Sequence, residues 1–260
     1  MKSLDNRMKE YYEFIPKTKL MRRTPVALRI DGKAFHTFTR GFKKPFDQVM
    51  MKSMQYTMKY LCENIQGCVF GYTQSDEITL ILIDYKNFES SAWFDYEVQK
   101  LCSISASMAT MAFNKIFRSY VTNTADGPFE FANYDEETKK YVDTLYKAME
   151  KGAMFDSRCF NIPKEEVCNL ILYRQNDASK NSIQMVARTY YSDTQLKGKQ
   201  NNVVQDMLFK DFGINWNDFP VECKRGTSCI KDEKGKWFID YNMPILKGED
   251  RKYVDKWIYV

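Results

Sequence analysis

The sequence has a single histidine, His36, among 260 residues. This scarcity excludes metalloproteases that need two histidines on one helix, and every site built from several imidazoles. A Ser-His-Asp triad would have to use His36, and no G-x-S-x-G turn accompanies it. The sequence also has no Walker A loop and no G-x-G-x-x-G run, which excludes P-loop ATPases and dinucleotide-binding oxidoreductases.

Close cysteine pairs and long apolar runs are missing as well. The seven cysteines include no C-x-x-C pair, and an odd, scattered set argues against a disulfide framework and a zinc knuckle. No run approaches the ~20 apolar residues of a membrane span, and charged residues interrupt the N-terminal stretch where a signal peptide would lie. We therefore expect a cytoplasmic protein in a reducing compartment, with no membrane partner.

The surplus of positive charge is small. With 39 basic and 34 acidic side chains the net charge is +5, which permits a polyanionic partner without requiring one. The basic residues nevertheless gather in local groups, and that grouping favours a large anionic substrate. The groups are Lys17, Lys19, Arg22 and Arg23; Arg40, Lys43 and Lys44; Lys197 and Lys199; Lys224 and Arg225; and Lys247, Arg251 and Lys252.

Two short acidic signatures stand at the ends of β-rich runs. The run at residues 24–30 leads into Asp31, and the runs at residues 68–74 and 77–84 form a predicted hairpin with Asp76 at its turn. If these strands are neighbours, both aspartates lie at one sheet edge. Two carboxylates placed there can share Mg²⁺ ions, as in nucleotidyl transfer. On the pattern alone, Asp31 also fits a turn-capping residue before glycine.

Helical patterns lie between and after these strands. Apolar residues three and four apart predict one helix between Pro45 and Gly67, another over residues 93–117 and a third over residues 136–151. A β-like piece follows at residues 159–162, and the order β-α-β-β-α-β is that of the ferredoxin-like palm. The apolar face of the second helix is predicted to contain Leu101, Ile104, Met108, Met111 and Ile116.

The remaining residues predict an extension. Helical patterns at residues 165–191 and 201–212 precede a tail with two β-like pieces. The predicted fold class is α+β: a ferredoxin-like, palm polymerase-type antiparallel sheet with packed helices, plus a C-terminal helical extension. We expect a palm-like catalytic domain at residues 1–163, and a helical extension with a β-rich tail at residues 164–260.

A series of short motifs follows along most of the chain. They are Ile30-Asp31-Gly32 with Phe35-His36; Lys44-Pro45 with Asp47; Gln74-Ser75-Asp76-Glu77; Lys100; Phe155-Asp156-Ser157-Arg158; Arg174-Gln175-Asn176-Asp177; Leu196-Lys197-Gly198; and Lys224-Arg225-Gly226-Thr227. Together this ordered set resembles the tRNA-His guanylyltransferases and their bacterial-type relatives, which are template-capable 3′–5′ nucleotide polymerases.

For the site, the resemblance implies a division of roles. Two Mg²⁺ ions would be held by the carboxylates of Asp31 and Asp76 and by the backbone carbonyl of Gly32, in keeping with the preference of magnesium for oxygen. Lys44 would assist activation of the RNA 5′ phosphate, and Glu77 would orient the catalytic carboxylates. The implied nucleotide-binding residues are Asp31, Gly32, Lys33, Ala34, Phe35, His36, Ser75, Asp76 and Lys100.

For the reaction, the resemblance implies nucleotide addition to the 5′ end of tRNA after activation by ATP or GTP. It also implies a homotetramer, and we expect the extension to contribute contacts between subunits. The eukaryotic enzymes carry His-Ile-Asn-Asn where this chain has Ser179-Lys180-Asn181-Ser182, and Glu97 stands where an arginine is expected. The first departure favours templated repair of 5′-truncated tRNAs over dedicated addition of G to tRNA-His.

Two other functions stay open. A palm-type nucleotide cyclase would share the two-aspartate edge, but its hallmark hairpin has two glycines and an aromatic residue that Gln74-Ser75-Asp76-Glu77-Ile78 lacks. A non-catalytic RNA-binding module is disfavoured by the intact acidic positions.

Contacts to an RNA backbone would position the RNA and make its binding salt-dependent. The predicted contacts are Arg22, Arg23, Arg174, Lys180, Asn181, Arg188, Lys197, Lys199 and Arg225.

Overall fold

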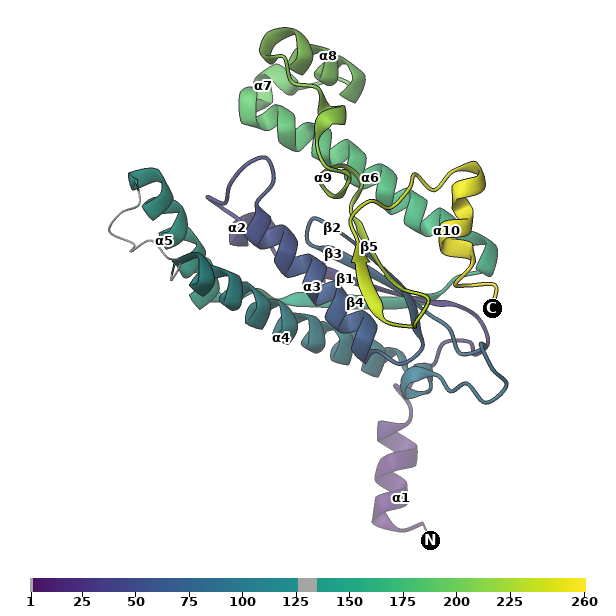
Figure 1. The fold of residues 1–260 in the computed structure, drawn as a ribbon. Helices are drawn as coiled ribbons and strands as arrows, with labels where there is room; N and C mark the ends of the chain where they lie inside the picture. The colour runs from purple at the N-terminus through teal and green to yellow at the C-terminus, as the bar shows by residue number, and fades with distance from the viewer. Residues whose placement is uncertain (1, 126–134) are drawn as a thin grey trace.

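The computed structural model describes residues 2–125 and 135–260. Its centre is a six-stranded antiparallel sheet with the strand order β4-β1-β3-β2-β5-β6 (Figure 1). The strands are β1 (Val26–Gly32), β2 (Cys68–Gln74), β3 (Glu77–Leu82), β4 (Phe155–Asn161), β5 (Thr227–Lys231) and β6 (Trp237–Asp240).

The first four strands confirm the predicted palm. Helix α3 (Gln48–Asn64) follows β1, the β2–β3 hairpin comes next, and α4 (Val98–Ala125) and α5 (Glu136–Lys151) precede β4. The order β4-β1-β3-β2 is the ferredoxin-like arrangement, and it places β1 between β3 and β4. The α+β fold class is confirmed, and β5 and β6 extend the same sheet beside β2.

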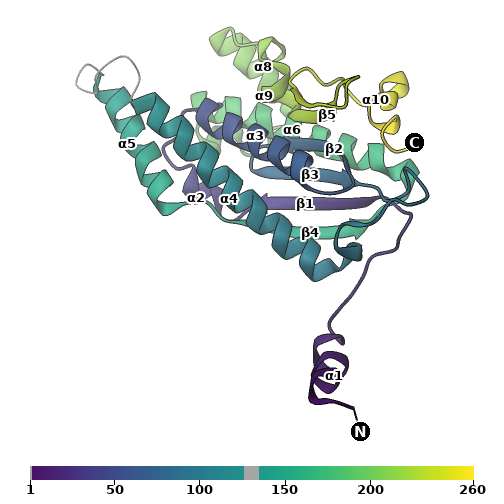
Figure 2. The same cartoon turned by 60° about the horizontal axis from the view of Figure 1, so that its bottom comes forward.

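The sheet separates two hydrophobic cores. Side chains on a strand alternate between its faces, so Leu28 and Ile30 pack with residues of α3 and α4, whereas Ala27 and Ile81 pack with residues of α6 (Lys164–Tyr190). Figure 2 shows α4 along the near face of the sheet and α6 along the far face. The helices therefore cover both faces of the palm strands.

The predicted apolar face of α4 is wrong in part. Ile104 and Met111 are exposed, and the small residues Ser105, Ala109 and Ala112 are among those buried instead. The reason is close packing, because the Ser105 hydroxyl on α4 donates to the Ser157 hydroxyl on β4 at 2.8 Å. A large side chain would not fit between backbones that lie so near each other. The buried residues are Leu101, Ser105, Ala109, Ala112, Phe113, Phe117 and Val121.

The helical extension is built on the distal half of α6. A third apolar cluster joins this half to α7 (Asp193–Leu196) and α8 (Asn201–Phe212), and includes Val186, Leu196 and Val204. The bounds of α5 and α8 agree with the helices predicted at residues 136–151 and 201–212. The division of the chain at residue 163 stays a prediction.

The N-terminal residues stand apart from this body. Helix α1 (Leu4–Met8) and the following π-helical turn η1 (Lys9–Glu13) contain no buried residue and project away from the sheet (Figures 1 and 2). The chain rejoins the body at a bridge between Lys19 and Glu97. Across both described ranges, no helix is long and apolar enough to cross a bilayer.

Candidate active site at the acidic rim

The end of β1 and the tip of the β2–β3 hairpin meet at one edge of the sheet. The Gly32 amide donates to the Asp76 carbonyl oxygen at 3.1 Å, and Asp31 lies opposite Glu77 in the register between β1 and β3. The structure therefore brings the two aspartate-bearing tips together. We call this edge the acidic rim and define it by Asp31, Gly32, Asp76 and Glu77.

The loop that leaves the rim is fixed by an aromatic ring. A Cβ on Gly32 would lie 2.2 Å from Cδ2 of Phe35, so this position accepts only glycine without displacing the ring. The Phe35 ring is buried and packs against Phe38, Phe113 and Phe155, with centroid distances of 5.0, 5.6 and 5.1 Å. The start of the loop is thus tied to the core on the α4 side of the sheet.

The backbone of the loop turns sharply after this anchor. Ala34 has φ of 54°, a left-handed conformation that costs a non-glycine residue energy, and the Lys33 amide donates to the Met154 carbonyl at 2.9 Å. The side chains of Lys33 and His36 are exposed, whereas Phe35 is buried. A nucleotide at this loop would meet its backbone and the two exposed side chains, with Phe35 serving as an anchor only.

The hairpin tip holds Asp76 in place. Ser75 has φ of 51°, and its hydroxyl donates to Asp76 Oδ1 at 2.9 Å. Burial raises the pKa of Asp76 above its ordinary value, the Ser75 hydrogen bond lowers it, the negative charge of Asp31 raises it, and His36 lowers it. The two aspartates are therefore close enough to oppose each other's ionisation.

Glu77 is held by two arginines. Its Oε1 accepts a hydrogen bond from Arg29 Nε at 2.9 Å, and its Oε2 accepts one from Arg174 Nη2 at 2.5 Å. Arg174 is only 6% exposed and also lies 3.4 Å from Asp177. Both carboxylate oxygens of Glu77 thus accept from an arginine, and these two positive charges offset the charge of the carboxylate. Glu77 ties the hairpin tip to α6, an arrangement compatible with the orienting role that the resemblance implies.

The two aspartates keep an unbalanced negative charge. Within residues 2–125 and 135–260, no basic group forms an ion pair with Asp31 or Asp76, and no cluster of three or more His, Cys, Asp or Glu side chains is suited to a metal. The available donors are two carboxylates and the Gly32 carbonyl. This all-oxygen, doubly negative set fits Mg²⁺, which commonly completes its shell with water and phosphate oxygens.

Lys44 lies in an exposed loop that Asp47 anchors. Asp47 caps α3: its Oδ1 accepts from the Met50 amide at 2.9 Å, and its Oδ2 accepts from the Lys43 amide at 3.0 Å. The hydroxyl of Tyr141, on α5, also donates to Oδ2 at 2.7 Å. The backbone beside Lys44 is thus fixed, while its own side chain reaches solvent.

Lys100 does not join the acidic rim. It lies in the first turn of α4, with its Nζ 3.9 Å from a Glu97 carboxylate oxygen. Ser105, one and a half turns later, contacts Ser157, which lies opposite Ile30 beside the rim. Since α4 approaches the rim as it runs from Lys100 to Ser105, Lys100 is displaced toward the start of β1.

The predicted RNA contacts fall into separate groups. Arg22 and Arg23 precede β1 and lie roughly 20 Å from Asp31, the length of that strand. Arg22 Nε donates to the buried Asp84 at 2.6 Å, and the Arg23 amide donates to it at 2.8 Å. The exposed members on the extension are Lys180, Asn181, Arg188, Lys197 and Lys199.

Two of the predicted RNA contacts lie inside the fold. The Arg174 guanidinium is buried against Glu77, which argues against a contact with RNA. Arg225 is half-buried, and its carbonyl oxygen accepts from the Tyr72 hydroxyl at 2.6 Å. Arg174 therefore ties the palm to the extension through its side chain, and Arg225 does so through its backbone carbonyl.

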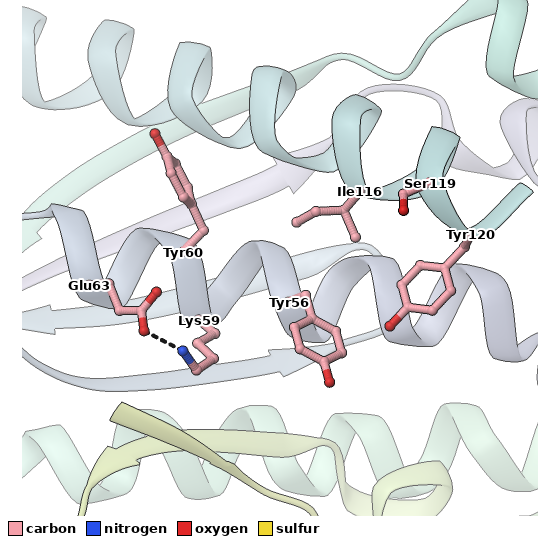
Figure 3. Close-up of a pocket in the computed structure, with 7 residues that line it drawn as sticks. All are labelled: Tyr56, Lys59, Tyr60, Glu63, Ile116, Ser119 and Tyr120. Atoms are coloured by element: carbon pink, nitrogen blue, oxygen red, sulfur yellow. Dashed lines mark hydrogen bonds and ion pairs between the residues drawn. The ribbon is translucent and has the colours of Figure 1, made fainter. Parts of the chain in front are cut away.

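A separate hollow of about 370 Å³ lies between α3 and α4, on their outer side (Figure 3). Three tyrosines line it, beside an ion pair between Lys59 and Glu63. None of the predicted site residues lies there. The lining residues are Tyr56, Lys59, Tyr60, Glu63, Ile116, Ser119 and Tyr120.

Two residues beside the rim have contacts that the sequence did not predict. Asp156 of β4 lies directly opposite Asp31, where it is exposed and 3.3 Å from Arg158. Arg29 of β1 pairs with Glu77 of the neighbouring strand β3. One signal was available for Arg29, because residues two apart on a strand face the same side, and Asp31 is two residues later.

Comparison with known proteins points to one family. The family model described as tRNAHis guanylyltransferase matches residues 5–163. The chain is 28% identical over 237 residues to an uncharacterized protein of Acanthamoeba polyphaga mimivirus, covering 86% of this chain and 75% of that one. It is 25% identical over 228 residues to a probable tRNA(His) guanylyltransferase of Dictyostelium discoideum, covering 82% and 77%.

Solved structures agree with this match. A bacterial tRNA(His) guanylyltransferase-like protein in complex with ATP superposes with a TM-score of 0.83 at 38% identity, covering 99% of this chain and 100% of that one. The GTP complex of such a bacterial protein gives 0.77 at 37%, with full coverage of both chains. The Saccharomyces cerevisiae tRNA(His) guanylyltransferase gives 0.66 at 21%, covering 89% and 95%, which supports the fold alone.

Proposed function

The chain belongs to the tRNA(His) guanylyltransferase family of nucleotidyltransferases, and from that premise we propose that it adds nucleotides in the 3′–5′ direction to the 5′ end of tRNA. The observation that carries the proposal is the hydrogen bond between the Gly32 amide and the Asp76 carbonyl. It supports a site in which Asp31 and Asp76 act on the same substrate. ATP or GTP would activate the 5′ end, and nucleoside triphosphates would be added.

Asp31, Asp76 and the Gly32 carbonyl would hold two Mg²⁺ ions. When bound in such a site, the ions lower the pKa of an attacking hydroxyl and neutralise charge on the phosphate that leaves. Phosphoryl transfer needs little covalent work from side chains, so positioning and charge decide the rate. The chain supplies both: Ser75 orients Asp76, and Glu77 holds the tip against α6.

The nucleotide would lie against the loop after β1. Gly32 permits close approach of the backbone, and the exposed Lys33 and His36 side chains can meet phosphate oxygens. Lys44, whose loop is held by Asp47, would meet the 5′ phosphate of the RNA. Lys100 lies in the first turn of α4, displaced from the rim, and its contact with the triphosphate stays a prediction.

We favour templated repair of 5′-truncated tRNAs as the task. The chain is 38% identical to a bacterial guanylyltransferase-like protein over nearly its full length, against 21% for the yeast tRNA(His) guanylyltransferase. At the position of the eukaryotic histidine motif stands Ser179, whose hydroxyl donates to the Gln175 carbonyl at 3.0 Å. A serine at this position supplies no imidazole for recognising a tRNA-His end.

The tRNA would contact the exposed basic residues of the extension. Lys180, Lys197 and Lys199 point into solvent on α6 and after α7, and lysines of this kind bind phosphates without reading sequence. The homo-oligomer that the resemblance implies is part of the same proposal. Recognition would then rest on the shape of the acceptor stem and its 2′-hydroxyls.

The decisive experiment supplies tRNAs that lack one to three 5′ nucleotides, with ATP, Mg²⁺ and one nucleoside triphosphate at a time. Repair predicts extension only by the nucleotide that pairs with the opposite strand, and no extension by the Asp31→Asn variant. Asp206→Asn, an exposed change on α8, is the matched control and should retain activity. Addition of G whatever the opposing base would support guanylylation instead, and activity in Asp31→Asn would remove the proposed site.

A further inference from the structure

The loop between α2 (Phe35–Phe38) and α3, residues 39–47, carries two neighbouring lysines, and we call it the lysine loop. Lys43 Nζ lies over the ring of Tyr141, on α5, at 4.5 Å from the ring centroid. A cation in this position is attracted by the ring face. The side chain of Lys44 is exposed and has no hydrogen bond or ion pair in the part of the chain that the structure describes. Of the two lysines, Lys44 is therefore the one available to a phosphate.

Tyr141 also fixes the end of the lysine loop. Its hydroxyl donates to Asp47 Oδ2 at 2.7 Å, and Asp47 is only 7% exposed. A buried carboxylate is costly unless its charge is paired or hydrogen-bonded, and Asp47 has no basic partner among the described side chains. Its carboxylate accepts three hydrogen bonds, two of them from the backbone amides of Lys43 and Met50. Within the described residues, Tyr141 is thus the one side chain that donates to it.

The rest of the lysine loop is attached through aromatic rings. Phe42 is buried and stacks on Phe117 of α4, with 5.9 Å between the ring centroids. Phe46 meets Phe219 of the extension edge-on at 5.6 Å. These contacts lie on either side of the two lysines in the sequence. Without the Tyr141 hydroxyl, the loop would stay attached at both ends, but the segment between the rings would be free to shift.

We propose that Tyr141 is a positioning residue for activation of the RNA 5′ phosphate, and that it acts through Lys44. This inference rests on the proposed function. In activation, an oxygen of the RNA 5′ phosphate attacks the α-phosphorus of ATP, a new P–O bond forms there, and pyrophosphate leaves. A lysine offsets the charge of that phosphate only from a fixed position, and a displacement of about 1 Å can cost about 100-fold in rate.

Addition to an RNA that already has a 5′ triphosphate does not need the activation step, because pyrophosphate is then the leaving group. The test therefore compares one 5′-truncated tRNA in two forms, with a 5′ monophosphate and with a 5′ triphosphate, in single-turnover extension assays with ATP and Mg²⁺. Tyr141→Phe keeps the ring beside Lys43 and removes only the hydroxyl that reaches Asp47. We expect extension of the monophosphate RNA to slow by about 10- to 100-fold, and extension of the triphosphate RNA to keep the wild-type rate.

Tyr146→Phe is the matched control. Tyr146 lies on the same helix and packs against the core on the α4 side of the sheet, and its hydroxyl has no hydrogen bond to any described residue. This variant should retain both rates. Circular dichroism checks the fold of each variant, and the rate of Tyr141→Phe on the triphosphate RNA is a second measure of an intact protein.

A double variant separates positioning from general damage. If Tyr141 acts through Lys44, then Lys44→Ala with Tyr141→Phe should be no slower on the monophosphate RNA than Lys44→Ala alone. Additive losses in the double variant would overturn the inference, and so would an equal loss of Tyr141→Phe on both RNAs or a wild-type rate on the monophosphate RNA. A wild type that extends neither RNA would instead remove the proposed function, and this inference with it.

Discussion

Replacing Asp76 by asparagine should stabilise the metal-free protein while abolishing nucleotide addition. Asparagine has nearly the same shape and keeps an oxygen that can accept the Ser75 hydrogen bond. It removes a charge that is partly buried beside Asp31 and has no ion pair within the described chain. The variant thus separates the cost of the charge from the packing of the hairpin tip.

The size of the effect follows from the repulsion between the two aspartates. Two unit charges about 4 Å apart in an effective dielectric constant of about 20 repel by about 4 kcal/mol, which sets the scale for neighbouring carboxylates. Because solvent reaches both carboxylates, screening reduces this to about 1 kcal/mol. For a chain of this length that corresponds to a melting temperature about 3 °C higher for Asp76→Asn at pH 7.

The dependence on pH gives the prediction its sign. Burial and the charge of Asp31 hold the folded-state pKa of Asp76 above its ordinary value. The folded protein therefore binds this proton more tightly than the unfolded chain does. The free energy of unfolding of the wild type falls as the pH rises from the ordinary pKa of an aspartate to the raised pKa of the folded state. The two proteins should melt together near pH 3, where the carboxyl is protonated in both states, and the variant should gain with rising pH.

Magnesium should reverse the order. A ligand that binds only the folded state at 100 times its dissociation constant adds about 2.7 kcal/mol, so Mg²⁺ should raise the melting temperature of the wild type above that of Asp76→Asn. Differential scanning fluorimetry at pH 3 to 8, with Mg²⁺ or with a chelator, measures both effects, and Asp206→Asn serves as the control. A metal-free Asp76→Asn that melts below the wild type at pH 7 would refute the reasoning.

Three further predictions test the surroundings of the rim. Gly32→Ala should lower stability by about 1–3 kcal/mol and impair addition, because the new Cβ meets the Phe35 ring at 2.2 Å; thermal melting and extension assays check this. Arg174→Ala should cost about 3 kcal/mol by leaving Glu77 without one of its partners, and urea unfolding of Glu77→Gln, Arg174→Ala and the double variant should show non-additive losses. Lys197→Gln should weaken tRNA binding and reduce the slope of log affinity against log salt by about 0.7–0.9, measured by filter binding.

The fold could be predicted from sequence because its elements have strong local signals. The helix at residues 136–151 alternates apolar and charged residues at helical spacing, and its observed bounds agree with the prediction. The face of α4 could not be predicted in this way. Its large residues Ile104 and Met111 point outward because Ser105 must fit against β4, and closeness of backbones leaves no periodic mark in a sequence.

The candidate site was predictable only in part. The approach of Asp31 and Asp76 follows from strand order, and strand order follows from the β-α-β-β-α-β pattern. The partners of Glu77 do not follow, because Arg29 and Arg174 come from positions 48 and 97 residues away. Long-range ion pairs depend on how α6 lies across the sheet. The displacement of Lys100 from the rim likewise depends on the direction in which α4 crosses β4.

The arrangement of charge at the rim explains why two aspartates, and not their acidic neighbours, are left for cations. Glu77 lies between two arginines, and Asp156 lies beside Arg158. Each of these neighbours has a positive partner within the chain, which reduces what it adds to the field at the edge. Asp31 and Asp76 have no such partner in the described residues, and their shared charge is the term that a bound cation would relieve. The fold therefore tolerates repulsion at one point of the sheet and removes it at the two adjoining ones.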